Sequence, residues 1–118
     1  MARRVLVADD NPVIRRMLCQ MFEKEQDYDL YAEARDGAEA IALAIKHKPE
    51  LIILDISMPI VDGIRAAKEL KDLMPDVPII LFSFYADEIN PDHVSADRIV
   101  SKTAASTLMD HVRQLLPV

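Results

Sequence analysis

The sequence predicts an α/β domain in which a parallel sheet is covered by helices on both faces. Short apolar runs, typical of buried parallel strands, alternate with longer segments whose apolar residues recur at helical spacing. The connections are short, so each strand is followed by a helix that crosses over to the next strand. A length of 118 residues is enough for one substantial core and too small for two domains.

Five apolar runs are the predicted strands. Two of them, 51–54 and 79–82, are apolar at every position, as expected of central strands that are buried on both faces. The other three predicted strands span residues 5–8, 30–34 and 98–101.

The helices of the first three connections have clear boundaries. The first begins near Pro12, because the fixed φ of proline suits the first helical turn and its missing N–H costs nothing there. The second follows the Asp36-Gly37 turn and is bounded by Pro49, and the third follows Gly63. The chain has only these two glycines, so we expect each to have a specific backbone role.

The fourth connection departs from this pattern, because Asn90-Pro91 interrupts it. The chain there forms either a broken helix or a short helix that begins at Pro91 and is capped by Asn90. The last helix is predicted over residues 105–116 and stops at Pro117.

Composition and charge exclude several classes of function. The chain has 14 Lys and Arg against 20 Asp and Glu, a net charge of −6 and no basic cluster, which argues against direct nucleic-acid binding. No apolar stretch approaches the roughly 20 residues of a membrane helix, and the apolar run after Arg4 is too short for a signal peptide. We therefore expect a cytoplasmic protein that does not contact a membrane.

The lone Cys19 excludes an internal disulfide, and its apolar neighbours predict a core position.

Polar residues follow four of the predicted strands, at the point where each strand ends. They are Asp9 and Asp10 after the first strand, Asp55 after the third, Ser83 after the fourth and Lys102 after the fifth. The carboxyl ends of parallel strands meet at one edge of a sheet, where α/β proteins bind their ligands. We therefore expect three carboxylates, a hydroxyl and an ammonium group to lie close together.

Three carboxylates at one edge call for a cation. Two unit charges about 4 Å apart repel by about 4 kcal/mol at an effective dielectric constant of about 20, so a cluster of acids either raises a pKa or recruits a metal ion. A hard divalent cation with oxygen ligands, above all Mg²⁺, fits such a group. The alternative is structural: Asp9 and Asp10 cap the first helix, and Asp55 starts a turn. Two strand ends that deliver acids to one edge favour the metal site.

Asp55 is the predicted nucleophile, because it stands alone at the end of the most buried strand. A carboxylate can attack phosphorus to form an acyl phosphate, and phosphoryl transfer needs mainly positioning and charge neutralisation. Lys102 would supply positive charge, and Ser83 would donate a hydrogen bond to a phosphoryl oxygen. Taken alone, these two residues are better explained as a solvated lysine and a strand-terminal hydroxyl. No glycine-rich phosphate loop is present, so the sequence gives little support to nucleotide binding.

Together, in this order and spacing, these residues resemble the receiver domain of two-component response regulators over essentially the full chain. The matching residues are Asp9-Asp10, Asp55 with Met58-Pro59, Asp62-Gly63, Ser83 and Lys102. The resemblance implies a flavodoxin-like, doubly wound (βα)5 fold, with a five-stranded parallel sheet in the order 2-1-3-4-5.

The resemblance also implies a role for each site residue. Asp55 would accept a phosphoryl group from the phosphohistidine of a histidine kinase. Asp10 and Asp55 would bind Mg²⁺ (or Mn²⁺) directly, together with the backbone carbonyl of Ser57, and Asp9 would act largely through water. Ser83 and Lys102 would contact the phosphoryl group and draw in the loop that follows the fourth strand.

As a receiver domain, residues 1–118 are expected to act as a phosphorylation-controlled switch rather than an enzyme, catalysing only their own phosphorylation and dephosphorylation. The expected partners are a histidine kinase and either a downstream protein or a linked output domain. We expect no output domain in this chain. The expected oligomeric state is a monomer or a phosphorylation-dependent dimer. Two alternatives stay open: a receiver cut from a longer DNA-binding transcriptional regulator, and a receiver-like domain that works without phosphorylation. A phosphatase of the haloacid-dehalogenase type is disfavoured, because it needs a second acid where this chain has Ser57.

Three features differ from the family pattern. Ile99 stands where family members often carry an aromatic residue that moves on activation, and Thr103 stands where proline usually follows the lysine. The stretch between the fourth and fifth strands is also short. For Phe84 and Tyr85 two hypotheses stay open: both pack the loop, or one of them moves on phosphorylation.

Overall fold

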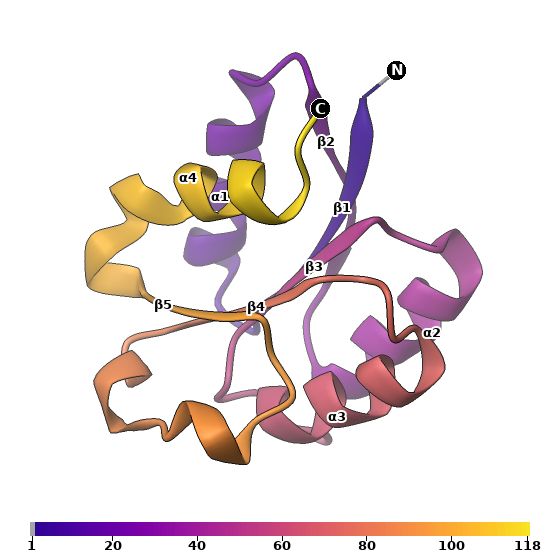
Figure 1. Ribbon diagram of the computed structural model, residues 1–118, viewed down its shortest axis with the longest axis vertical. Coiled ribbons are helices and arrows are strands. Elements are labelled where there is room, and N and C mark those ends of the chain that lie inside the picture. Colours follow the sequence, from indigo (N-terminus) through magenta and orange to yellow (C-terminus); the bar gives the residue numbers. More distant parts are fainter. Residues whose placement is uncertain (1) are drawn as a thin grey trace.

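The computed structural model describes residues 2–118, which form one five-stranded parallel sheet in the order β2-β1-β3-β4-β5 (Figure 1). The strands are β1 (Arg3–Ala8), β2 (Tyr28–Ala34), β3 (Leu51–Leu54), β4 (Ile79–Ser83) and β5 (Arg98–Ser101). The predicted strand order is confirmed, and β3 and β5 have the predicted bounds. β1 and β2 begin earlier than predicted, because Arg3 already pairs with Tyr28.

Four α-helices cover the sheet within residues 2–118. They are α1 (Pro12–Glu23), α2 (Gly37–His47), α3 (Gly63–Leu73) and α4 (Leu108–Leu115). The side chains of Asn11, Asp36 and Asp62 begin the first three, each accepting a hydrogen bond from a backbone N–H of the first turn. The predicted start of the first helix at Pro12 is confirmed.

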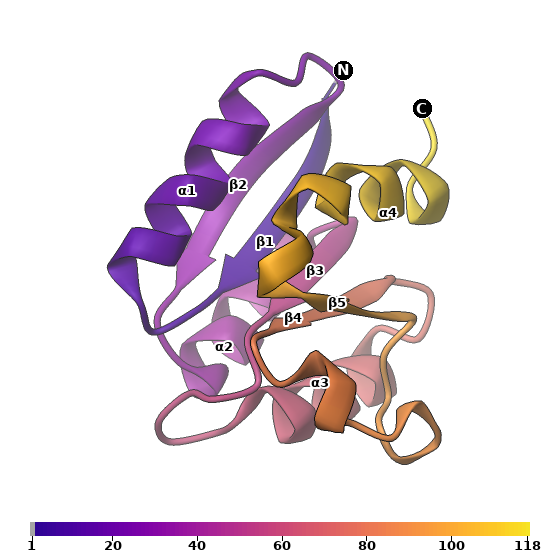
Figure 2. The same cartoon turned by 90° about the vertical axis from the view of Figure 1, so that its left-hand side faces the viewer.

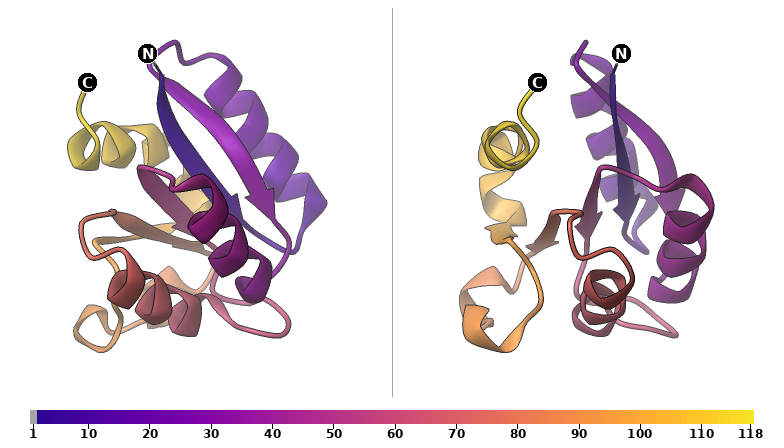
Figure 3. Two further views of the ribbon diagram at one scale, coloured as in Figure 1. Left: turned by 90° about the vertical axis from the view of Figure 1, so that its right-hand side faces the viewer. Right: turned by 45° about the vertical axis from the view of Figure 1, so that its right-hand side comes forward.

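The helices lie in two layers, with α1 and α4 on one face of the sheet and α2 and α3 on the other (Figures 2 and 3). Leu18 of α1 and Val112 of α4 pack on the first face against Ile53 of β3 and its neighbours. Leu70 of α3 and the alanines of α2 pack on the second face, against Ile52 and Leu54. Because successive side chains of a strand point to opposite faces, β3 must be apolar throughout.

Cys19 corrects one expectation about this core. It lies on the flank of α1 and is only half-buried, outside the cluster that Leu18 and Phe22 join. Burial and the nearby carboxylate of Glu33 raise the pKa of its thiol.

The fourth connection contains no α-helix, so the fourth helix of a complete (βα)5 pattern is reduced to short turns, as the interruption at Asn90-Pro91 predicted. Two 3-10 turns, η1 (Ala86–Glu88) and η2 (Pro91–His93), link β4 to β5 instead. Asn90 caps the second turn by accepting a hydrogen bond from the Asp92 N–H at 3.0 Å, as one of the two alternatives expected. Proline at 91 lacks an N–H and disfavours the helical conformation in the residue before it, so no longer helix can form across this position.

The last helix is also shorter than predicted. A 3-10 segment, η3 (Lys102–Thr107), follows β5 directly and has a non-helical residue at Ala104 (φ −115°, ψ 39°), so α4 begins only at Leu108. None of the helices in residues 2–118 has the length and apolar character needed to cross a membrane.

Candidate functional site

The register of the sheet brings the predicted acids together. Ala8 of β1 pairs with Leu54 of β3, so Asp9 and Asp55 leave neighbouring strands at the same level. The Asp55 N–H donates to the Ala8 carbonyl at 2.8 Å, which continues the ladder by one residue. Oxygen atoms of Asp9, Asp10 and Asp55 all lie within 4.8 Å of one another.

Burial differs sharply among the three acids. Asp9 and Asp55 are 1% and 6% exposed, whereas Asp10 faces solvent. Two carboxylates this deeply buried and this close together repel each other strongly unless positive charge is near.

Lys102 supplies that charge from the start of η3. Its ammonium nitrogen lies 2.6 Å from Oδ2 of Asp9 and 3.3 Å from Oδ1 of Asp55, and its side chain is only 5% exposed. The Ser101 side chain accepts a hydrogen bond from the Thr103 N–H at 3.1 Å and so fixes the turn that carries the lysine. The expectation that the side chains of Asp9, Asp55 and Lys102 lie close together at one edge of the sheet is confirmed.

The hydrogen bonds leave particular oxygens free. Asp9 has both oxygens engaged, since Oδ1 accepts from the Asn11 N–H at 2.9 Å and Oδ2 from Lys102. Asp55 has Oδ1 engaged by the Ile56 N–H at 2.8 Å, while no group of residues 2–118 donates a hydrogen bond to its Oδ2. Asp10 likewise accepts no side-chain or backbone hydrogen bond from the described residues. The free oxygens are therefore those of Asp10 and Oδ2 of Asp55.

Burial is the main cause of the raised pKa of Asp55, and the negative charge of Asp9 raises it further. Lys102 and the Ile56 N–H act in the opposite direction without cancelling the effect. A cation bound among the three carboxylates would favour the charged form of Asp55.

Ser83 ends β4 beside this cluster and is 1% exposed. Its Oγ accepts a hydrogen bond from the Tyr85 N–H at 3.0 Å, so the hydroxyl proton stays available to donate. Phe84, for which the sequence left two hypotheses open, lies next to the cation of the site: the Lys102 ammonium is 5.3 Å from the centre of its ring. The only sequence signal was its position next to Ser83, because a cation–π contact depends on how two distant segments fold together.

The loop between β3 and α3 is held close to Asp55 by Gly63. A Cβ atom at Gly63 would lie 1.9 Å from the Asp55 carbonyl oxygen, and the Gly63 N–H donates to the Ile56 carbonyl at 2.9 Å. Gly37 approaches the same loop from α2, since a Cβ there would lie 2.0 Å from the Val61 carbonyl oxygen. The expected backbone roles of both glycines are confirmed, and both are close approaches rather than unusual φ values.

The same loop contains a strained residue. Ile60 has a φ of 68°, which is an unfavourable conformation for a β-branched side chain, and the residue is 80% exposed. The Val61 N–H donates to the Pro59 carbonyl at 2.8 Å, which closes a tight three-residue turn around it. Ser57 lies at the start of this loop and is exposed.

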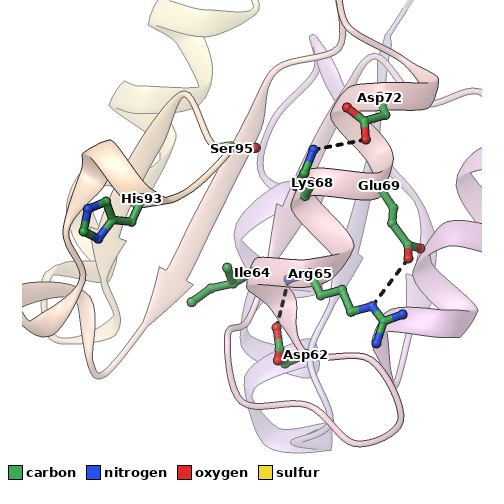
Figure 4. A pocket seen from close by; sticks show the side chains of 8 residues that line it. All are labelled: Asp62, Ile64, Arg65, Lys68, Glu69, Asp72, His93 and Ser95. Carbon is green, nitrogen blue, oxygen red and sulfur yellow. Dashed lines mark hydrogen bonds and ion pairs between the residues drawn. The ribbon is translucent and has the colours of Figure 1, made fainter.

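A separate pocket of about 460 Å³ lies between α3 and the fourth connection (Figure 4). Its walls carry exposed ion pairs along α3, Arg65–Glu69 at 3.6 Å and Lys68–Asp72 at 3.3 Å. None of Asp9, Asp10 and Asp55 lines this pocket, so the strand-end cluster lies elsewhere.

The cluster fits a hard divalent cation, because its free donors are carboxylate oxygens within one ion's reach. Mg²⁺ is expected to raise the melting temperature of the protein relative to EDTA, since a ligand held only by the folded state stabilises it by about 2.7 kcal/mol at 100 times its Kd. Thermal unfolding at increasing Mg²⁺ measures this. For Asp10→Asn, we expect the Mg²⁺ concentration needed for the same rise in melting temperature to be at least tenfold higher than for wild type. Asp29→Asn, which removes an exposed carboxylate, is the control and should respond to Mg²⁺ as wild type does. Equal Mg²⁺ responses in Asp10→Asn and wild type would contradict this metal site.

A family model for the response regulator receiver domain matches residues 5–113. The chain belongs to this family. The receiver domain is a regulatory switch of two-component systems, and domains of this family bind Mg²⁺ at an acidic pocket and act with histidine kinases and output domains.

Two relatives show where such domains occur. The transcriptional regulatory protein PdtaR of Mycobacterium tuberculosis is 47% identical over 83 residues, which are 69% of this chain and 40% of that protein. A protein-glutamate methylesterase/protein-glutamine glutaminase of Hahella chejuensis is 40% identical over 83 residues, 70% of this chain and 21% of that protein. The receiver domain therefore spans less than half the length of these relatives.

Solved structures agree with the receiver fold. The response regulator domain of Thermotoga maritima CheB superposes with a TM-score of 0.89 at 28% identity, covering 100% of this chain and 98% of that one. The response regulator TrrA of Thermotoga maritima, in complex with Mg(2+)-BeF, gives a TM-score of 0.86 at 32% identity, with 97% and 99% coverage.

Proposed function

We propose that this receiver domain accepts a phosphoryl group on Asp55 from the phosphohistidine of a histidine kinase, in a reaction that requires Mg²⁺ or Mn²⁺. The observation that carries the proposal is the state of Asp55: it is buried beside Lys102 and Asp9, yet its Oδ2 is free of hydrogen bonds from residues 2–118. A buried carboxylate with one unengaged oxygen is suited to attack a phosphorus atom that enters from the sheet edge.

Asp55 acts as the nucleophile in this proposal. Its free oxygen forms a bond to phosphorus while the P–N bond of the phosphohistidine breaks, and the electron pair of that bond stays on the leaving imidazole nitrogen. The Ile56 N–H holds the other oxygen at 2.8 Å and so orients the carboxylate for attack. Asp10, Asp55 and the Ser57 carbonyl would hold the metal ion, which neutralises phosphoryl charge, while Asp9 acts through water because its own oxygens are engaged.

Ser83 and Lys102 contact the phosphoryl group once it is attached to Asp55. Lys102 can exchange its contact with Asp55 for a phosphoryl oxygen, because it lies 3.3 Å from the carboxylate that carries the group. Ser83 donates its hydroxyl proton to another phosphoryl oxygen. Since the Tyr85 N–H is bonded to the same hydroxyl oxygen at 3.0 Å, movement of Ser83 is passed to the segment that begins the fourth connection.

The domain works as a switch and not as an enzyme on a separate substrate. Its output goes through a downstream protein or a linked output domain, in a cytoplasmic pathway, and as a monomer or a phosphorylation-dependent dimer. The net charge of −6 supports a domain that does not bind nucleic acid directly, even where the full-length regulator is a transcriptional one. The buried Lys102 bridging Asp9 and Asp55 favours phosphorylation over the alternative of a phosphorylation-independent domain.

Incubation with acetyl phosphate tests this function. We expect the protein to gain the mass of one phosphoryl group with Mg²⁺ and none with EDTA, and peptide mapping to locate the group at Asp55. Lys102→Ala is expected to keep phosphoryl uptake and to lose most of the accompanying spectral change of Tyr85. An unchanged wild-type mass with Mg²⁺ would refute the proposed function, and an undiminished response in Lys102→Ala would remove the lysine from its role.

A further inference from the structure

The side chain of Phe84 covers the ammonium group of Lys102. Phe84 is 59% exposed, whereas the Lys102 side chain is 5% exposed and its nitrogen lies 5.3 Å from the ring centre. The two carboxylates that also contact Lys102 belong to buried residues. The exposed ring therefore lies over an ammonium group that is itself shielded from solvent.

The backbone on both sides of Phe84 is anchored. Ser83 is buried at the end of β4, and the Tyr85 N–H is bonded to its hydroxyl oxygen, so residue 84 is held between two anchored neighbours. A phenylalanine that merely packed the loop would be expected to bury its ring against apolar side chains, whereas more than half of Phe84 is exposed. The ring lies within cation–π distance of the Lys102 ammonium group.

We propose that Phe84 acts as a lid that prolongs the life of the phosphorylated state, an inference that rests on the proposed function. Loss of the phosphoryl group requires a water molecule whose oxygen bonds to phosphorus while the P–O bond to Asp55 breaks. This step restores the Asp55 carboxylate and releases inorganic phosphate and a proton. The ring limits the approach of that water from the Lys102 side. It also holds the ammonium group in place through the cation–π contact.

Two measurements on the full chain test the lid separately. The first is the rate at which acetic anhydride modifies Lys102 in the unphosphorylated protein, relative to Lys68, whose side chain is 70% exposed and serves as an internal standard. The second is the decay of the phosphorylated protein after acetyl phosphate is removed, followed by intact mass. Phe84→Ala is expected to raise both rates about fivefold, a factor that corresponds to about 1 kcal/mol.

Matched variants separate the ring from the loop. Phe84→Trp keeps an aromatic face and is expected to keep both rates close to wild type, and Tyr85→Ala removes the neighbouring exposed aromatic side chain and is expected to change neither. Circular dichroism shows whether each variant is folded, and Phe84→Leu takes the place of Phe84→Ala should the latter unfold. Unchanged Lys102 reactivity in the folded variant would overturn the lid. Raised reactivity with unchanged decay would overturn its role in lifetime. A wild type that takes up no phosphoryl group would refute the proposed function itself, whatever the reactivity of Lys102.

Discussion

Replacing Asp55 by asparagine is expected to abolish phosphoryl uptake and, without divalent cations, to stabilise the fold. Uptake is lost because the amide oxygen is not a nucleophile toward phosphorus. Stability rises, on the order of 1 kcal/mol, because the charged form of Asp55 is disfavoured by burial and by Asp9. Intact mass after acetyl phosphate treatment measures the first effect, and urea unfolding in EDTA at pH 7 measures the second.

The stability difference should depend on pH in a defined direction. Since the pKa of Asp55 is raised in the folded state, the folded protein binds this proton more tightly than the unfolded chain does. Its ionisation therefore costs no stability below the pKa of the unfolded chain, about 3.9. The cost grows as the pH rises through the window up to the raised pKa, and it is complete above that window. The stability advantage of Asp55→Asn over wild type should therefore be larger at pH 7 than in acid, and it should disappear below the pKa of the unfolded chain.

A control variant and the effect of Mg²⁺ test whether the stability gain comes from the loss of the Asp55 charge. Asp29→Asn removes an exposed carboxylate of β2 and is expected to leave both uptake and stability close to wild type. Mg²⁺ should stabilise wild type more than Asp55→Asn. The stability advantage of the variant over wild type should therefore shrink or reverse when Mg²⁺ is added. A variant less stable than wild type in EDTA at pH 7 would show that the net effect of Asp9 and Lys102 on Asp55 is attractive.

Gly63→Ala is expected to destabilise the domain by about 3 kcal/mol. The new Cβ would lie 1.9 Å from the carbonyl oxygen of Asp55 and 2.7 Å from its carbonyl carbon, and neither backbone atom can turn aside as a flexible side chain would. Either α3 or the end of β3 has to shift. A shift at β3 moves the phosphoacceptor, so phosphoryl uptake should fall together with stability. Urea unfolding and the acetyl phosphate assay measure the two effects.

The sign of the Gly63 result is informative, because alanine is the better helix former by about 1 kcal/mol. A substitution governed by helix propensity would stabilise the protein, whereas one governed by the close approach destabilises it. Arg65→Ala, on the exposed side of the same helix, is the control and should change stability by about 0.5 kcal/mol or less. An unfolding midpoint of Gly63→Ala equal to that of wild type would mean that the loop can yield without cost.

The sequence predicted the strands and the strand-end cluster because both depend on local rules. An all-apolar run such as Leu51–Leu54 is explained only by burial on both faces, and parallel strands bring their carboxyl ends to one edge. The fourth connection was harder, because Pro91 shows where a helix must stop but not which turns replace it. Cys19 was misplaced because helical spacing defines a stripe without showing how far its flank is covered.

By itself, then, the sequence determined the fold class, the order of elements and the identity of the residues at the switch edge. Only the tertiary structure decided how those residues share their contacts: Lys102 between Asp9 and Asp55, Oδ2 of Asp55 left free, and Phe84 over the ammonium group. The reason is physical. Periodicity and strand ends depend on neighbouring residues, whereas Lys102 meets Asp9 across 93 positions of sequence, and such a contact is set by the packing of the whole sheet.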